Sequence, residues 1–114
     1  MNQLDDLRHL LDEIGVHTTI KTFRDGFEQL ICAGSRNRDG FLCGNSFWVT
    51  QDKSRHWFVV TWRPVAYAFP ESLSLDAIST ICQSLLRLSN VPIYEIPAEL
   101  LDRYGIEETN PDAV

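Results

Sequence analysis

His56 and Cys43 could together do nucleophilic chemistry, because an imidazole across a hairpin from a thiol can act as its base. Cys43 lies among apolar residues, however, where desolvation disfavours the thiolate. His9 is one helical turn from both Asp5 and Glu13 and could join them in binding a metal, but these residues equally form a solvated helix face. We therefore predict no catalytic residue, no metal site and no cofactor.

Local sequence motifs support the same prediction. No phosphate-binding glycine loop, nucleophile elbow, HExxH motif or paired Cys/His spacing occurs in the sequence. The cysteines Cys32, Cys43 and Cys82 are odd in number, form no C-x-x-C pair and stand among apolar residues, which predicts reduced thiols rather than a disulfide. The sequence therefore favours a protein without enzymatic activity. An enzyme whose active-site residues are scattered along the chain is also compatible with it.

Three arginines are brought towards one rim by the expected topology. In an antiparallel meander, the turn between the second and third strands lies at the same end of the sheet as the end of the fourth strand. Arg36 and Arg38 then approach Arg63. Because guanidinium groups pair well with carboxylates and other anions, we predict a contact with an anion or an acidic partner there. The alternative is a set of solvated turn charges partly paired with Asp39.

Aromatic residues gather between positions 41 and 70, which contain all three tryptophans and four of the six phenylalanines. The strand predicted over residues 56 to 63 places Trp57, Val59 and Thr61 on one face and Phe58, Val60 and Trp62 on the other. Neither face is polar, so both should be covered. We predict binding residues at Trp48, Phe58 and Trp62, in an aromatic concavity that also includes Trp57.

Hydrophobic periodicity predicts three helices. Leucines spaced by three and four indicate a helix over residues 3 to 14. Ser74 can cap a second helix with a broad apolar face, and Pro97 and Gly105 bracket a third helix from Ala98 to Tyr104. We expect one core where the second helix packs on the sheet, formed by Trp57, Val59, Ile78, Ile81 and Leu85.

Runs of β-branched and aromatic residues separated by turn signals predict strands at residues 16 to 23, 27 to 34, 41 to 50 and 56 to 63. Residues 65 to 69 are expected to be extended or to form a short fifth strand. Gly44-Asn45 indicates a bulge or a late start of the third strand near Ser46. The predicted class is α+β: a four-stranded, or five-stranded, antiparallel meander with an N-terminal helix and two C-terminal helices.

Length and composition predict a single domain over residues 1 to 106 and a mobile acidic tail over residues 107 to 114. The formal net charge of −6 disfavours nucleic acid and anionic membranes and favours a basic or neutral protein partner. The N-terminus lacks the basic and apolar regions of a signal peptide, and no apolar run is long enough to span a membrane. We therefore expect a cytoplasmic protein.

Three functions fit these expectations. The first is a small acidic protein-binding module, because bacterial immunity proteins and secretion chaperones often have this size, charge and order of elements, although no motif matches residue by residue. The second is an enzyme or small-ligand domain with its site in the tryptophan-rich concavity. The third is a structural subunit that buries its second sheet face in a homodimer. The first helix could cover that face instead, which would leave a monomer.

Overall fold

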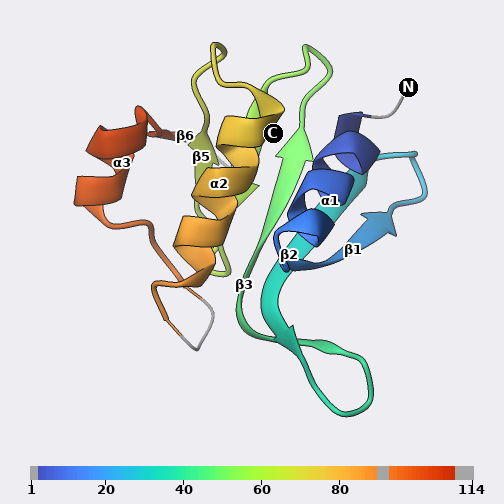
Figure 1. Ribbon diagram of the computed structural model, residues 1–114. Helices are drawn as coiled ribbons and strands as arrows, with labels where there is room; N and C mark the ends of the chain where they lie inside the picture. The colour runs from blue at the N-terminus through green and yellow to red at the C-terminus, as the bar shows by residue number, and fades with distance from the viewer. Residues whose placement is uncertain (1–2, 90–92, 110–114) are drawn as a thin grey trace.

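The computed structural model describes residues 3–89 and 93–109, which form three helices and one antiparallel sheet (Figure 1). The helices are α1 (Gln3–Glu13), α2 (Leu75–Leu86) and α3 (Ala98–Tyr104). The strands are β1 (His17–Thr22), β2 (Glu28–Arg36), β3 (Leu42–Gln51), β4 (Trp57–Val60), β5 (Ala66–Ala68) and β6 (Glu107–Thr109). They lie side by side in sequence order. The predicted α+β class and its helices are confirmed, and the sheet extends beyond the predicted strands.

Local capping explains where the C-terminal helices begin and end. Ser74 precedes α2, and its hydroxyl oxygen accepts a hydrogen bond of 3.2 Å from the amide of Ala77. Gly105 ends α3 in the left-handed conformation, with a φ of 67°, which glycine adopts without steric cost. The next residue, Ile106, is buried in the core. These ends agree with the predicted ones.

Two elements at the β5 side of the sheet differ from prediction. β4 stops at Val60 rather than near residue 63, because the amide of Thr61 donates to the Val65 carbonyl (3.0 Å) and turns the chain. The tail expected from residue 107 begins instead with β6, which pairs with β5. Its sequence is acidic and carries no strand signal, so backbone pairing beside the buried Ile106 is what places it. Residues 110–114 of the expected tail lie outside the described residues.

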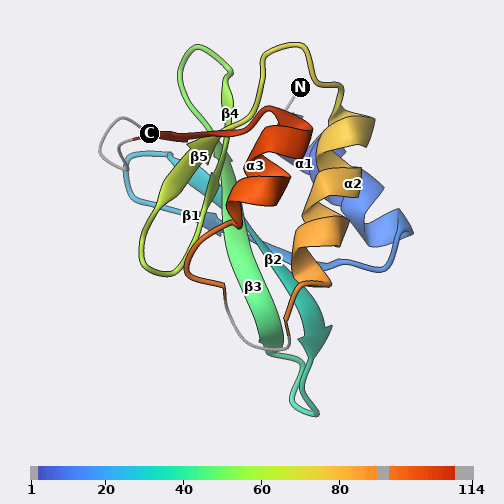
Figure 2. The same cartoon turned by 90° about the vertical axis from the view of Figure 1, so that its left-hand side faces the viewer.

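Helices α1 and α2 pack side by side on one face of the sheet (Figure 1). Figure 2 shows the described helices on one side of the sheet only, so α1 does not cover the second face. Val59, Ile78, Ile81 and Leu85 are buried together in the core between the two layers, and Trp57 is partly buried against them. The predicted packing of the second helix on the sheet is therefore confirmed.

A bulge interrupts the pairing of β2 with β3. The register passes from Ala33 opposite Ser46 to Ser35 opposite Cys43, so Gly44 and Asn45 together oppose the single residue Gly34. Gly44 has a φ of 79°, the left-handed conformation that a glycine supplies in such bulges. This confirms the bulge predicted at Gly44-Asn45.

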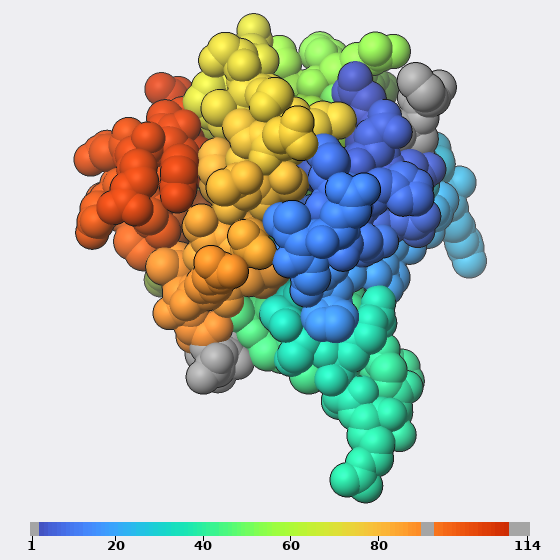
Figure 3. All heavy atoms as spheres, in the orientation of Figure 1, coloured from blue at the N-terminus to red at the C-terminus, as the bar shows by residue number. Residues whose placement is uncertain are grey.

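Beyond the bulge, the hairpin of β2 and β3 continues as a projection from the body of the molecule (Figure 3). We call residues 35–43 the arm. Ser35 pairs with Cys43 and Arg36 with Leu42 at its base, and the turn over residues 37–41 forms its tip. The arm lies at the same end of the sheet as the β4–β5 connection, as the order of antiparallel strands requires.

Candidate functional site

Trp48 and Trp62 meet on the sheet face that the helices leave uncovered. Trp48 lies opposite Val60, and its ring makes an edge-on contact with that of Trp62, with centroids 4.9 Å apart. The indole nitrogen of Trp62 donates a hydrogen bond of 2.9 Å to the hydroxyl of Ser46. Because its polar atom is bonded within the chain, the 48% of Trp62 that is exposed presents an apolar surface.

The predicted aromatic concavity is smaller than expected. Trp57 packs against the helix-covered core, because side chains alternate along the strand and Trp57 belongs to the opposite face from Trp48. Phe58 lies on the same face as Trp48 but is only 7% exposed. Among the predicted aromatic binding residues, Trp62 is thus the exposed one, and Phe58 is buried beneath the surface.

The segment that precedes α3 is bonded to the residues around Trp62. The buried hydroxyl of Thr61 donates to the Tyr94 carbonyl (2.7 Å), and the amide of Trp62 donates to the Ile93 carbonyl (3.4 Å). One residue further along, the guanidinium of Arg63 pairs with the carboxylate of Glu95. These contacts hold the segment before α3 against the β4–β5 connection.

The two segments border an open hollow of about 330 Å³ that is lined by Trp62, Arg63 and Tyr94. We call it the Trp62 hollow. Tyr94 is 62% exposed, so two aromatic rings are open to solvent there. Trp, Tyr and Arg are the residue types that most often dominate the energetics of protein–protein contacts. The hollow therefore has the composition of an interaction site.

Asn45 fixes the position of the segment that carries Tyr94. The side chain is 1% exposed, and its amide nitrogen donates to the carbonyls of Leu85 (2.8 Å) and Leu86 (3.3 Å) at the end of α2. Its carbonyl oxygen accepts from the amide of Ile93 (3.2 Å). One side chain thus joins β3, α2 and the wall of the Trp62 hollow.

Tyr67 holds the far end of the same segment. It is buried, and its hydroxyl oxygen accepts a hydrogen bond of 3.1 Å from the amide of Ile96. Burial raises the pKa of this phenol above its ordinary value, although the hydrogen bond from Ile96 acts in the opposite direction. Sequence reasoning missed both Asn45 and Tyr67 as positioning residues. The one signal in the sequence is that each of these two residues carries a polar group inside a largely apolar strand.

The three predicted arginines lie towards one end of the sheet but have separate roles. The Arg36 guanidinium donates to the carbonyls of Gly40 (2.7 Å) and Thr18 (2.8 Å), so it braces the base of the arm. Arg38 lies in the exposed tip. Arg63 is paired with Glu95 in the Trp62 hollow. The described contacts join none of the three to another, so the predicted contact of this rim with an anion stays a prediction.

His56 and Cys43 cannot act together, because they lie at opposite ends of the hairpin. His56 is in the turn after β3, where its ring nitrogens face Glu71 (2.7 Å) and Asp52 (3.5 Å). Cys43 lies at the other end of β3, next to its first residue, and the Cys43 sulfur lies 3.2 Å from the hydroxyl of Ser35. In residues 3–89 and 93–109, no group of three His, Cys, Asp or Glu side chains could hold a metal ion.

Cys32 and Cys82 are buried where β2 meets α2. The pKa of Cys32 lies well above its ordinary value, chiefly because of a hydrogen bond with Cys82 and also because of burial. A thiol in this state is a poor nucleophile.

We expect all three thiols to be free in the purified protein. Denaturing the protein without reductant and counting thiols with a chromogenic disulfide reagent should give three per chain, with native mass spectrometry showing no added metal. The protein treated with reductant before denaturation is the control. Fewer than three thiols in the unreduced sample would contradict the prediction.

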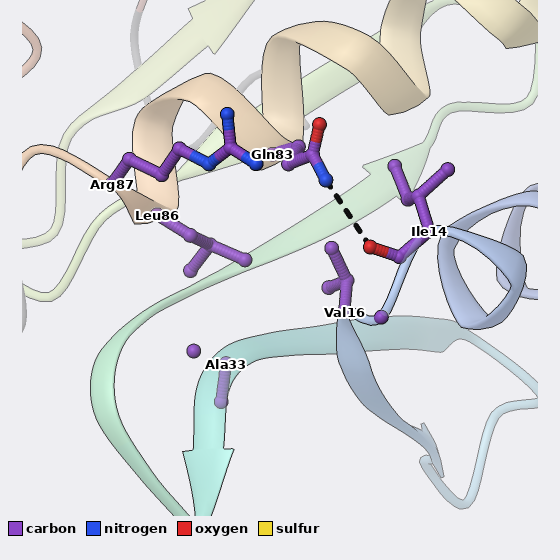
Figure 4. A pocket seen from close by; sticks show the side chains of 8 residues that line it. Ile14, Val16, Ala33, Gln83, Leu86 and Arg87 are labelled. Atoms are coloured by element: carbon purple, nitrogen blue, oxygen red, sulfur yellow. Dashed lines mark hydrogen bonds between the residues drawn. The ribbon is translucent and has the colours of Figure 1, made fainter.

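A second hollow, of about 220 Å³, lies where the end of α1 faces β2 and the end of α2 (Figure 4). Its apolar lining includes Val16, Ala33 and Leu86, while the Gln83 amide nitrogen donates to the Ile14 carbonyl (3.1 Å) across it. Its remaining lining residues are Gly15, Gly34 and Arg87. None of these side chains is a nucleophile or a base at neutral pH, so the lining supplies no acid–base or covalent chemistry.

Comparison with protein families, with curated proteins and with solved structures finds no match to this chain. Within the described residues, no helix has the length and apolar character needed to cross a membrane.

Proposed function

We propose that this chain is a small cytoplasmic protein-binding module whose contact surface is the Trp62 hollow. The observation that carries the proposal is the set of exposed Trp62, Arg63 and Tyr94 side chains around a hollow of about 330 Å³. The scaffold behind them is fixed by Asn45 and Tyr67, which are buried and hydrogen-bonded. Exposed aromatic side chains on a fixed scaffold lose little conformational freedom on binding.

Exposure favours a protein over a small ligand at this surface. Small-molecule sites bury most of their ligand in a concave, largely enclosed pocket. Trp62 and Tyr94 are about half exposed or more, and the one cation among the described lining residues, Arg63, is already paired with Glu95. A broad surface of a partner protein covers such rings better than a small molecule does. The net charge of −6 favours a partner that is basic or neutral.

A homodimer is the second candidate, and the position of α1 favours it. Because α1 lies beside α2, no described helix covers the sheet face of Trp48 and Trp62. A second copy of the chain could bury that face, since closed two-fold dimers are the commonest soluble assemblies.

Affinity purification of tagged protein from the cells that produce it tests the protein-binding proposal. We expect the wild-type chain to recover a partner in stoichiometric amount and Trp62→Ala to lose at least about 30-fold in affinity for it, the size of a hot-spot truncation. The matched control is Phe23→Ala, which alters an exposed aromatic residue at the other end of the sheet. Equal recovery by Trp62→Ala, or no partner with the wild type, would contradict the proposal.

A further inference from the structure

The tip of the arm is held in one shape by hydrogen bonds. The Asn37 side-chain oxygen accepts from the amides of Asp39 (2.9 Å) and Phe41 (3.0 Å), and the Asn37 amide donates to the Phe41 carbonyl (2.8 Å). Gly40 takes a φ of 88°, the left-handed conformation that closes such a turn. Together with the two bonds from Arg36 to backbone carbonyls, these contacts preorganise the tip.

The fixed tip displays an aromatic ring and a cation. Phe41 is 69% exposed, the largest value among the described large apolar side chains. Arg38 is exposed, and no described residue hydrogen-bonds or ion-pairs with its side chain. Neither residue contributes to the core of its own chain. A preorganised tip that presents these groups is suited to a contact outside its own chain.

Charge indicates which kind of surface the arm fits. The arm holds two of the ten basic residues and one of the sixteen acidic ones, so its formal charge is +1 while the rest of the chain carries −7. The segment 93–109, which begins at the wall of the Trp62 hollow, contains five acidic residues and one basic residue. The arm is therefore the basic part that an acidic surface favours as its contact, and it complements segment 93–109 of a second copy even though each whole copy carries −6.

We propose that the arm of one copy docks in the Trp62 hollow of a second copy, with Phe41 between Trp62 and Tyr94 and Arg38 facing the acidic segment 93–109. This inference rests on the proposed function, because it names the partner of the same hollow. The hollow of about 330 Å³ is lined by two exposed aromatic residues, which favour contact with a third ring.

Topology allows the contact to be reciprocal. The arm and the β4–β5 connection lie at the same end of the sheet (Figure 1), so two copies facing each other at that end can exchange arms around a two-fold axis. Each copy then gives one arm and receives one, which closes the assembly as a dimer. The site is incomplete without the residue that the second copy supplies.

Light scattering of the purified full chain tests this dimer. At micromolar concentration, we expect a mass near twice the 13.1 kDa of one chain. Phe41→Ser should raise the dissociation constant at least about 30-fold, as the loss of a central aromatic anchor does. Arg38→Glu should raise it as well, and this exposed substitution leaves the fold intact. The control Phe23→Ser should remain a dimer.

Mixing two variants gives a sharper result. Phe41→Ser lacks the anchor but keeps the hollow, whereas Trp62→Ala lacks the hollow but keeps the anchor. Each alone should be monomeric, while their mixture should form a heterodimer through the one intact contact. Circular dichroism of each variant checks that it is folded. A monomeric wild type, a dimeric Phe41→Ser variant, or no heterodimer in the mixture would overturn the inference.

The outcomes separate this inference from the proposed function. If the purified protein is monomeric and Trp62→Ala still loses a captured partner, the hollow binds a different protein and the arm contact is wrong. If Trp62→Ala changes neither self-association nor capture, the proposed function fails as well.

Discussion

Replacing Leu85 by alanine should lower the free energy of unfolding by about 2 to 5 kcal/mol, the range for a fully buried leucine. Leu85 is 0% exposed and packs in the layer between α2 and the sheet, together with Val59, Ile78 and Ile81. The substitution removes apolar contacts and leaves a cavity, because helix and sheet can collapse around it only in part.

Denaturant unfolding of the two proteins measures the effect. Leu88→Ala is the matched control, since Leu88 follows α2 by two residues and is exposed. We expect the control to change stability by less than about 1 kcal/mol, as surface substitutions do. A loss below about 0.5 kcal/mol for Leu85→Ala would contradict the packing of α2 described above.

The core could be predicted from the sequence because its signal is periodic. The apolar positions of α2 recur at helical spacing, and β4 is apolar on both faces, so the apolar face of the helix and one face of the strand require each other. The caps at Ser74 and Gly105 are local in the same way, since a hydroxyl or a left-handed glycine acts within a few residues of its own position.

The face on which α1 packs could not be predicted, because one apolar stripe fits either side of a sheet. The side depends on the short connection, where Gly15 turns the chain with a φ of 85° and the Thr18 hydroxyl donates to the Asp12 carboxylate (3.0 Å). The turn at Gly15 and the hydrogen bond from Thr18 to Asp12 are set by local backbone and side-chain geometry, which the pattern of apolar and polar residues does not encode. The sequence alone is for this reason compatible with cover of the second sheet face by α1 or by a second copy of the chain.

The candidate site was predictable only in part. Aromatic enrichment identified Trp48 and Trp62, and meander topology placed Arg63 near the same end of the sheet. Tyr94 was not predicted as a site residue, because it is brought to Trp62 by contacts between segments about 30 positions apart in the chain. A pairing of His56 with Cys43 was already disfavoured by the apolar residues around Cys43 in the sequence. Register excludes it, because it places the two residues at opposite ends of the hairpin.

Replacing Asn45 by alanine should lower the free energy of unfolding by about 2 to 4 kcal/mol, because several buried hydrogen bonds are lost at once. The Leu85 and Leu86 carbonyls and the Ile93 amide all lose the partner they share in this side chain. A buried polar group without a partner costs about 1 to 3 kcal/mol in desolvation. A helix leaves its last carbonyls without partners inside the helix, although the Leu85 carbonyl also accepts a hydrogen bond of 3.2 Å from the amide of Leu88.

Asn37→Ala is the matched control for Asn45→Ala, because it removes an asparagine that also bonds to backbone amides, but in the exposed tip of the arm. We expect it to cost about 1 kcal/mol or less, since water can replace the lost partner. Comparing the two in denaturant unfolding separates the effect of burial from that of asparagine itself. Asn45→Ala should also weaken partner binding at the Trp62 hollow, because the Ile93 amide is released from the bulge and Tyr94 follows it. Equal losses of stability for the two variants would show that Asn45 does not clamp the wall of the hollow.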